Sequence, residues 1–194
     1  MVGAKPPNLG IRSLPVRLTA IAAAFALLSL PVAAGAALKV GATAPNFRTQ
    51  GAIAGKPFTL TLREELKKGP VVLYFFPAAF TKGCTLEAHE FAEASDDFAR
   101  AGARVIGMSA DPIDKLARFS VEECRNKFAV ATASPKVIKA YDVKLPLMPG
   151  RSNRTSYVIA PTGKVIYAHS DLDYRDHVKN TLAAVRSWKA SKRR

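Results

Sequence analysis

Apolar positions alternate between strand-like and helix-like spacing from residue 38 onward. Val71 to Phe76 is continuously apolar and rich in β-branched and aromatic side chains, which predicts a central strand buried on both faces. Ala103 to Ser109 has the same character. Weaker patterns predict an edge strand or short hairpin at 56–62, a short strand at 129–133, and a hairpin formed by 155–160 and 164–170.

Helical spacing separates these strands. The pattern predicts helices at residues 84–100, from Asp111-Pro112 to about 126, at 135–141 and at about 174–190. Gly102 stands where the first helix should end. Asp111 followed by Pro112 predicts an N-cap with proline in the first turn.

The segment order β-α-β-α-β-α-β-β-α predicts an α/β fold with a mixed central sheet flanked by helices. Each β-α-β connection favours parallel strands, whereas the late hairpin must pair antiparallel. This is the outline of a thioredoxin-like fold. No repeat or change of composition divides residues 37–194, so we expect one domain there. Fold alone does not establish function.

The first 36 residues have the composition of a secretory signal peptide. Lys5, Arg12 and Arg17 precede the apolar run Leu18 to Leu30, and Ala34-Gly35-Ala36 offers a cleavage site. The apolar run is short for a membrane span. We therefore predict a cleaved leader over residues 1–36, export to the periplasm and no stable membrane span afterwards. An uncleaved membrane anchor is the less favoured alternative.

The chain is strongly basic, with a formal net charge of +14. Net charge governs association and solubility rather than a specific partner. The cations are scattered, and only the run from Lys189 to Arg194 is dense, which suits a solvated helix end. We therefore expect no specific nucleic-acid partner.

Two cysteines, Cys84 and Cys124, are too few for a disulfide scaffold. They can form one redox pair or one structural bridge, and an oxidising compartment permits both. Cys84 stands where the apolar strand region gives way to a helix. Free backbone N–H groups and the helix dipole favour a thiolate in the first turn of a helix. Cys84 is therefore the candidate nucleophile.

The residues around Cys84 form the pattern Pro77-x-x-x-Thr81-x-x-Cys84, which resembles the active-site signature of the peroxiredoxins. The resemblance extends from the Gly41–Phe47 segment to the Arg154–Ile159 segment and is greatest to the bacterioferritin comigratory protein branch. It implies a thiol-dependent peroxidase that reduces hydrogen peroxide or organic hydroperoxides. It also implies a thioredoxin-like or other thiol reductant, no cofactor, and a monomer.

The resemblance assigns the central chemistry to Cys84 and Arg154. Cys84 is expected to be the peroxidatic thiolate, which attacks a peroxide oxygen and becomes a sulfenic acid. Arg154 is expected beside it, where a fixed guanidinium stabilises the thiolate and polarises the peroxide. Arg151 is a competitor for this place, although Arg154 matches the family pattern better.

Three further residues receive roles from the same resemblance. The Thr81 hydroxyl is expected to bond to the thiolate or the peroxide, and it also suits an ordinary N-cap. Pro77 is expected to shape the loop and shield the sulfur, because proline stiffens the chain and lacks an N–H. Glu87 is a supporting residue that holds the loop or Arg154, although an acid in a first helical turn is also favourable by itself.

The sequence departs from the branch at the second cysteine. Many members carry a resolving cysteine five residues after the first, where this chain has His89. The remaining candidate is Cys124, which we expect to resolve the oxidised sulfur as an intramolecular disulfide. The alternative is a small buried core residue, because Cys124 is in helical phase with Ile113 and Ala117.

The remaining motifs exclude other chemistry. His89, His169 and His177 lack metal-ligand spacing, and His169 and His177 are expected at the surface or at strand ends, so we expect no metal site. The absence of a Cys-x-x-Cys motif disfavours a thioredoxin-type disulfide exchanger. Two rival functions remain: an exported thioredoxin-like binding or chaperone protein with a non-catalytic disulfide, and a peroxide sensor that passes its oxidation to a partner.

Overall fold

The computed structural model describes residues 1–3 and 37–193, so residues 4–36, which hold nearly all of the predicted leader, lie outside the described part. A seven-stranded sheet has the order β2-β1-β5-β4-β3-β6-β7. The strands are β1 (Arg48–Ile53), β2 (Lys56–Thr61), β3 (Val71–Phe75), β4 (Arg104–Ser109), β5 (Ala129–Thr132), β6 (Thr155–Ile159) and β7 (Val165–Ser170). The helices are α1 (Leu62–Leu66), α2 (Lys82–Glu93), α3 (Ser95–Ala101), α4 (Ile113–Glu122), α5 (Pro135–Ala140) and α6 (His177–Ser191).

The sheet is mixed, as the segment order predicts. Strand β4 pairs in parallel with β3 and β5, because a helical crossover precedes each new strand. Strands β6 and β7 form the predicted antiparallel hairpin, and β6 pairs antiparallel with β3. The early hairpin is β1 with β2, and β1 joins the sheet through β5. The predicted thioredoxin-like fold is confirmed.

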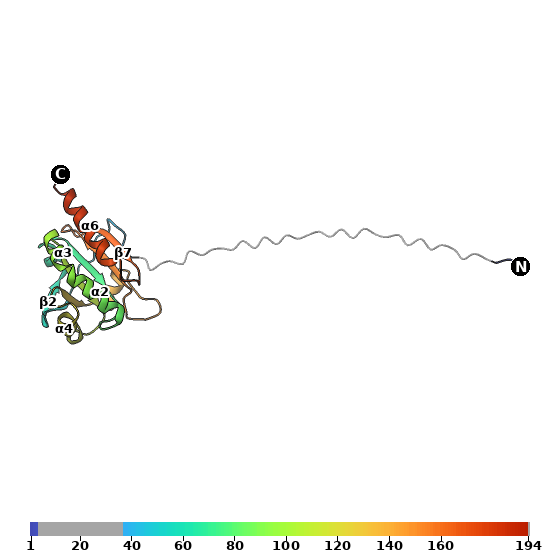
Figure 1. The fold of residues 1–194 in the computed structure, drawn as a ribbon, viewed down its shortest axis with the longest axis horizontal. Helices are drawn as coiled ribbons and strands as arrows, with labels where there is room; N and C mark the ends of the chain where they lie inside the picture. Colours follow the sequence, from blue (N-terminus) through green and yellow to red (C-terminus); the bar gives the residue numbers. More distant parts are fainter. Residues whose placement is uncertain (4–36, 194) are drawn as a thin grey trace. The chain divides into compact units, whose positions relative to one another are not determined.

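Strand β3 lies at the centre of the sheet and all five of its residues are buried. Its alternate side chains enter two apolar clusters, one on each face of the sheet. Helices α2, α3, α4 and α6 contribute to the first cluster and lie together in Figure 1. Helices α1 and α5 contribute to the second cluster. Burial on both faces explains the continuous apolar run in this strand.

The helix predicted at 84–100 is in fact two helices, α2 and α3. The backbone changes direction at Ala94, where ψ is −1°. The Ser95 hydroxyl donates to the Phe91 carbonyl oxygen at 2.9 Å, and such a back-bond from serine bends a helix. Helix α3 ends at Gly102, which has the left-handed backbone predicted for that position, with φ of 85°.

The predicted helix starting at Asp111-Pro112 is shorter than expected. Helix α4 begins at Ile113, its N-cap is Pro112, and it ends at Glu122 rather than near residue 126. The prediction of Asp111 as the cap is wrong, because its carboxylate accepts hydrogen bonds from elsewhere in the fold. Helix α1 was not predicted at all. In residues 1–3 and 37–193, no helix has the length and apolarity needed to span a membrane.

Candidate active site

Cys84 is the third residue of α2, directly after the loop that leaves the central strand β3. Its side chain is buried, with 2% of the residue exposed. The thiol therefore lies in the first helical turn, as the sequence predicts, among backbone N–H groups that have no partner within the helix. Its sulfur accepts a hydrogen bond from Arg154 Nη2 at 3.6 Å.

Arg154 is fixed by three separate contacts. Nη2 donates to Cys84, Nε donates to the Leu172 carbonyl oxygen at 2.9 Å, and Nη1 forms an ion pair with Glu87. Burial by itself would lower the pKa of Arg154, but Glu87 and Cys84 outweigh burial and raise it. The guanidinium is therefore a permanent cation with one orientation.

The strand register explains why Arg154 reaches a cysteine so distant in sequence. Strand β6 runs antiparallel to β3, and Thr155 pairs with Phe75. The residue before β6 consequently lies at the end of the sheet where the Cys84 loop begins. Gly83 leaves room for this approach, because a Cβ there would lie 3.3 Å from Arg154 Nη2.

Arg151, the sequence-based competitor, lies in a different network. Its Nη1 forms an ion pair with Asp111 Oδ1 at 2.8 Å and also donates to the Pro77 carbonyl oxygen at 3.4 Å. Asp111 Oδ2 accepts from the Ala79 N–H at 2.7 Å. Arg151 and Asp111 therefore hold the loop before Cys84, while Arg154 contacts the sulfur itself.

Asp111 is a site-building residue that the sequence patterns assigned to another role. It is 2% exposed, and it also accepts from Ser109 Oγ at 2.8 Å and pairs with Lys115 Nζ at 3.0 Å. Burial would raise the pKa of Asp111, but these hydrogen bonds outweigh burial and lower it to about 2. The carboxylate is thus ionised and joins the end of β4 to the active-site loop.

Thr81 and Pro77 both lie in this loop. Thr81 is the N-cap residue of α2 with extended backbone, but its side chain makes no capping bond. Instead its hydroxyl donates to the Ala78 carbonyl oxygen at 3.0 Å, and the residue is exposed. Pro77 is half-buried, two residues after β3. Phe80, which directly precedes Thr81, has φ of 66°, a left-handed conformation that is uncommon for a bulky residue.

Glu87 and His177 form a second group behind Arg154. Both side chains are fully buried, and His177 Nδ1 lies 3.8 Å from Glu87 Oε1. The prediction that His177 lies at the surface or at a strand end is wrong. His177 is the first residue of α6, and the loop before this helix turns it toward the interior. It was missed because an isolated histidine near a helix start carries no local pattern that indicates burial.

Cys124 lies in the turn after α4 and is fully buried, in the same apolar cluster as Cys84. Burial raises its pKa well above the ordinary value. Both cysteines are free thiols. Burial agrees with the alternative of a small core residue.

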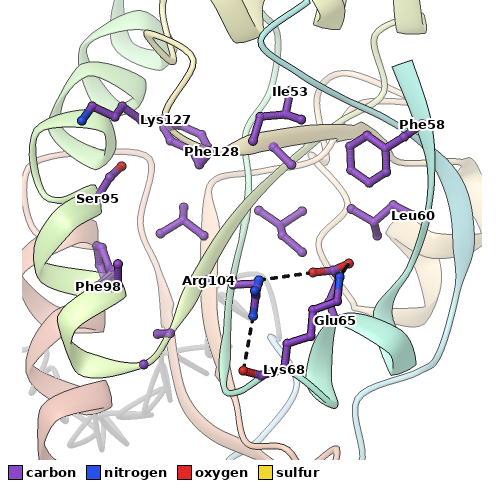
Figure 2. Close-up of a pocket in the computed structure, with 16 residues that line it drawn as sticks. Ile53, Phe58, Leu60, Glu65, Lys68, Ser95, Phe98, Arg104, Lys127 and Phe128 are labelled. Carbon is purple, nitrogen blue, oxygen red and sulfur yellow. Dashed lines mark hydrogen bonds and ion pairs between the residues drawn. The ribbon is translucent and has the colours of Figure 1, made fainter. Parts of the chain in front are cut away.

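A hollow lined mainly by other residues lies on the described part of the chain. It has a volume of about 580 Å³ and is lined by Phe58, Phe98 and Phe128, among others, with Arg104 pairing with Glu65 at its edge (Figure 2). It includes the first residues of β4 and β5, whereas Cys84 follows the last residue of β3. Neither Cys84 nor Cys124 lines it.

Comparison with known proteins decides the family. The profile of the AhpC/TSA family matches residues 40–168. The chain belongs to this family, the peroxiredoxins. Chloroplastic peroxiredoxin Q of Sedum lineare is 30% identical and aligns with 77% of this chain and 78% of its own length. Peroxiredoxin Bcp of Bacillus subtilis is 28% identical, with 77% of this chain and 96% of the relative covered.

Solved structures agree with this assignment. The crystal structure of peroxidoxin BcpB from Mycobacterium tuberculosis is 34% identical, has a TM-score of 0.67, and covers 77% of this peroxiredoxin and 97% of that chain. The predicted resemblance to the bacterioferritin comigratory branch is confirmed. This peroxiredoxin is therefore an oxidoreductase of a family that reduces peroxides with a thiol donor. Among residues 1–3 and 37–193, no cluster of side chains is suited to a metal ion.

Proposed function

We propose that this peroxiredoxin reduces hydrogen peroxide and small organic hydroperoxides through Cys84. The observation that carries the proposal is the 3.6 Å contact between Cys84 Sγ and Arg154 Nη2 at the start of α2. The thiolate attacks the terminal peroxide oxygen, the O–O bond breaks, and Cys84 becomes a sulfenic acid. The other oxygen leaves as hydroxide or alkoxide and takes up one proton.

The neighbouring groups support this reaction in different ways. Arg154 and the N–H groups of the first α2 turn stabilise the negative charge on sulfur and on the leaving oxygen. The Thr81 hydroxyl has a lone pair free to accept from the peroxide while it donates to Ala78. Pro77 lies in the loop and has no backbone N–H to donate. The ion pair of Arg151 with Asp111 fixes the position of the loop.

We further propose that Cys124 resolves the oxidised sulfur. The Cys124 thiolate attacks the Cys84 sulfur, an S–S bond forms, and hydroxide leaves and is protonated to water. Because Cys124 is fully buried, the turn that carries it must open first. Arg125 and Asn126 have φ of 50° and 61°, and two consecutive strained residues make the packed turn less costly to leave.

Titration of the reduced protein with hydrogen peroxide, followed by mass analysis of each cysteine, tests both steps. We expect wild type to form one intramolecular disulfide, Cys124→Ser to stop at sulfenic acid on Cys84, and Cys84→Ser to consume no peroxide. An active Cys84→Ser protein would overturn the first proposal. Oxidised wild type without a disulfide would overturn the second.

A coupled assay with thioredoxin addresses the reductant. We propose a thioredoxin-like or other dithiol protein, because an intramolecular disulfide is reduced by dithiol exchange. Turnover with thioredoxin but not without it is expected. A peroxide sensor would instead transfer its disulfide to a partner and turn over slowly, and a binding protein would keep a disulfide that resists mild reductant.

We also propose that the protein is exported to the periplasm after removal of residues 1–36, and that it is a monomer. The charged start, apolar run and small-residue end of the leader support export. Cell fractionation with intact mass measurement should give a periplasmic product that begins near residue 37. Light scattering should give the mass of one chain, and a dimer mass would contradict the monomer.

A further inference from the structure

Four ionisable side chains form a buried row that ends at the reactive sulfur. Arg154 Nη2 lies 3.6 Å from Cys84 Sγ, Arg154 also pairs with Glu87, and Glu87 Oε1 lies 3.8 Å from His177 Nδ1. Cys84 and Glu87 belong to α2, Arg154 directly precedes β6, and His177 begins α6. The proposed reaction uses Cys84 and Arg154, and it leaves Glu87 and His177 without a chemical role.

The hydrogen-bond partners of His177 show which of its ring nitrogens carries a hydrogen. Nε2 lies 3.0 Å from the Asp171 carbonyl oxygen, and a carbonyl oxygen can only accept, so Nε2 carries a hydrogen. Nδ1 lies 2.8 Å from Ser156 Oγ, whose hydroxyl can donate to it. A neutral imidazole therefore satisfies both ring nitrogens. Burial lowers the pKa of His177 to about 4, which agrees with the neutral form.

Glu87 is less well satisfied. Oε2 accepts from Arg154, but the buried Oε1 has no hydrogen-bond partner within residues 1–3 and 37–193. An ionised carboxylate with one unsatisfied oxygen is costly in an apolar interior. A proton on Oε1 removes the charge and with it the larger part of this cost. Burial raises the pKa of Glu87 to about 8, even though Arg154 opposes the shift.

The charges of Arg154, Cys84 and Glu87 balance only when this proton is present. Arg154 supplies one positive charge to two acidic groups, Cys84 and Glu87. If both were ionised beside a neutral His177, one negative charge would remain buried without a counterion. We propose that Glu87 and His177 together retain one proton, carried by Glu87 Oε1 beside a neutral His177 or by His177 Nδ1 beside an ionised Glu87, so that the charge of Arg154 serves the Cys84 thiolate.

This inference rests on the proposed role of Cys84 as the peroxidatic thiolate, and it makes Glu87 and His177 positioning residues. Other titratable or charged groups face the pair from the surrounding elements. They are Glu90 on α2, Tyr74 on β3, His169 on β7, and Asp171 in the loop before α6. His169 packs edge-on against His177 with ring centres 4.5 Å apart.

The proton should control the peroxide reaction on the alkaline side. When the pair loses its proton, Glu87 becomes a full anion and competes with Cys84 for Arg154. Arg154 then stabilises the leaving oxygen less well, so oxidation of Cys84 by peroxide slows. The decline should appear at or above the pH of about 8 at which Glu87 titrates, because a thiolate nearby delays its ionisation.

Glu87→Gln distinguishes a protonated Glu87 from an ionised Glu87 paired with Arg154, because glutamine is neutral and has nearly the same shape as the protonated carboxyl group. The measurement is the rate of Cys84 oxidation by hydrogen peroxide in Cys124→Ser protein, as a function of pH. We expect Glu87→Gln to react within about twofold of the parent at neutral pH and to lack the alkaline decline. His177→Asn should move the decline to lower pH, since it removes the second site for the proton. His89→Gln, which removes an α2 histidine outside the row, should follow the parent.

Infrared spectroscopy of the full chain provides a readout that does not need activity. A carbonyl band of a protonated carboxylic acid should be present at neutral pH and absent in Glu87→Gln. A rate lowered about a hundredfold at every pH in Glu87→Gln would show that the ion pair is required instead. An unchanged profile in His177→Asn, or absence of the band, would also overturn the proposal. If Cys84 does not react with peroxide, the proposed function fails. The carbonyl band still shows whether Glu87 is protonated, so the two failures can be told apart.

Discussion

His89 Nε2 lies 2.7 Å from Glu123 Oε2, so the helix that carries Cys84 is bonded to the residue before Cys124. Two ion pairs continue along the same contact, Glu93 with Arg125 at 3.3 Å and Asp96 with Lys127 at 3.6 Å. His89 therefore links helix α2 to the segment that carries Cys124, the proposed resolving cysteine. These pairs resist the opening that the proposed disulfide requires.

Weakening the His89 contact should speed disulfide formation. Glu123→Gln removes the charge of a pair whose side chains are 30% and 19% exposed. Partly exposed pairs contribute about 0.2–1 kcal/mol, which predicts a rise in the rate of about 1.4-fold to fivefold. The rate is measured by trapping the disulfide after one equivalent of peroxide.

Lys179→Gln is the matched control, because it breaks an exposed pair with Asp176 at 2.9 Å on α6. It should leave the rate unchanged. Equal rates in Glu123→Gln and wild type would mean that the packed turn, rather than the ion pair, limits opening.

Replacing Asp111 should loosen the active-site loop. Asp111→Asn can still accept from Ala79, but it loses the charged bonds to Arg151 and Lys115. We expect a loss of about 1–3 kcal/mol in the free energy of unfolding, measured with denaturant, and slower oxidation of Cys84. Asp114→Asn, an exposed change in the first turn of α4, is the control and should be near wild type.

The same residue predicts how stability depends on acid. The pKa of Asp111 is about 2 in the folded protein, below the ordinary value of about 3.9 in an unfolded chain. Its stabilising effect, roughly 2 kcal/mol, is therefore complete above about pH 4 and is lost as the pH falls toward 2. Unfolding of wild type and Asp111→Asn should differ above this range and converge below it. A constant difference across the range would contradict the assignment.

Arg154→Lys tests the fixed geometry of the cation beside Cys84. A lysine cannot reproduce the three directed contacts to Cys84, Glu87 and Leu172. We expect the second-order rate with hydrogen peroxide to fall about a hundredfold, by analogy with loss of one oxyanion donor. Arg151→Lys should have a much smaller effect, because it keeps a cation near Asp111. Similar losses in both variants would indicate that loop position matters more than contact with sulfur.

Most of the fold could be predicted from local pattern. The apolar run of β3, the late hairpin and the end at Gly102 are each determined by neighbouring residues, and all were correct. The errors fall where distant contacts override local preference. Ser95 divides one predicted helix, and Asp111 leaves its expected cap position to bind the Ala79 N–H of the Cys84 loop.

The sequence by itself determined the position of the Cys84 sulfur, because a cysteine in the first turn of a helix after a buried strand is a local arrangement. It also determined the family, since Pro77, Thr81, Cys84 and Arg154 follow one another in a specific order. The tertiary structure alone decided which side chains surround that sulfur. Arg154 reaches Cys84 through the antiparallel register of β6 with β3, and His177 reaches Glu87 because α6 packs beside α2. Such contacts depend on strand pairing and helix packing across the whole chain, and no short stretch of sequence encodes them.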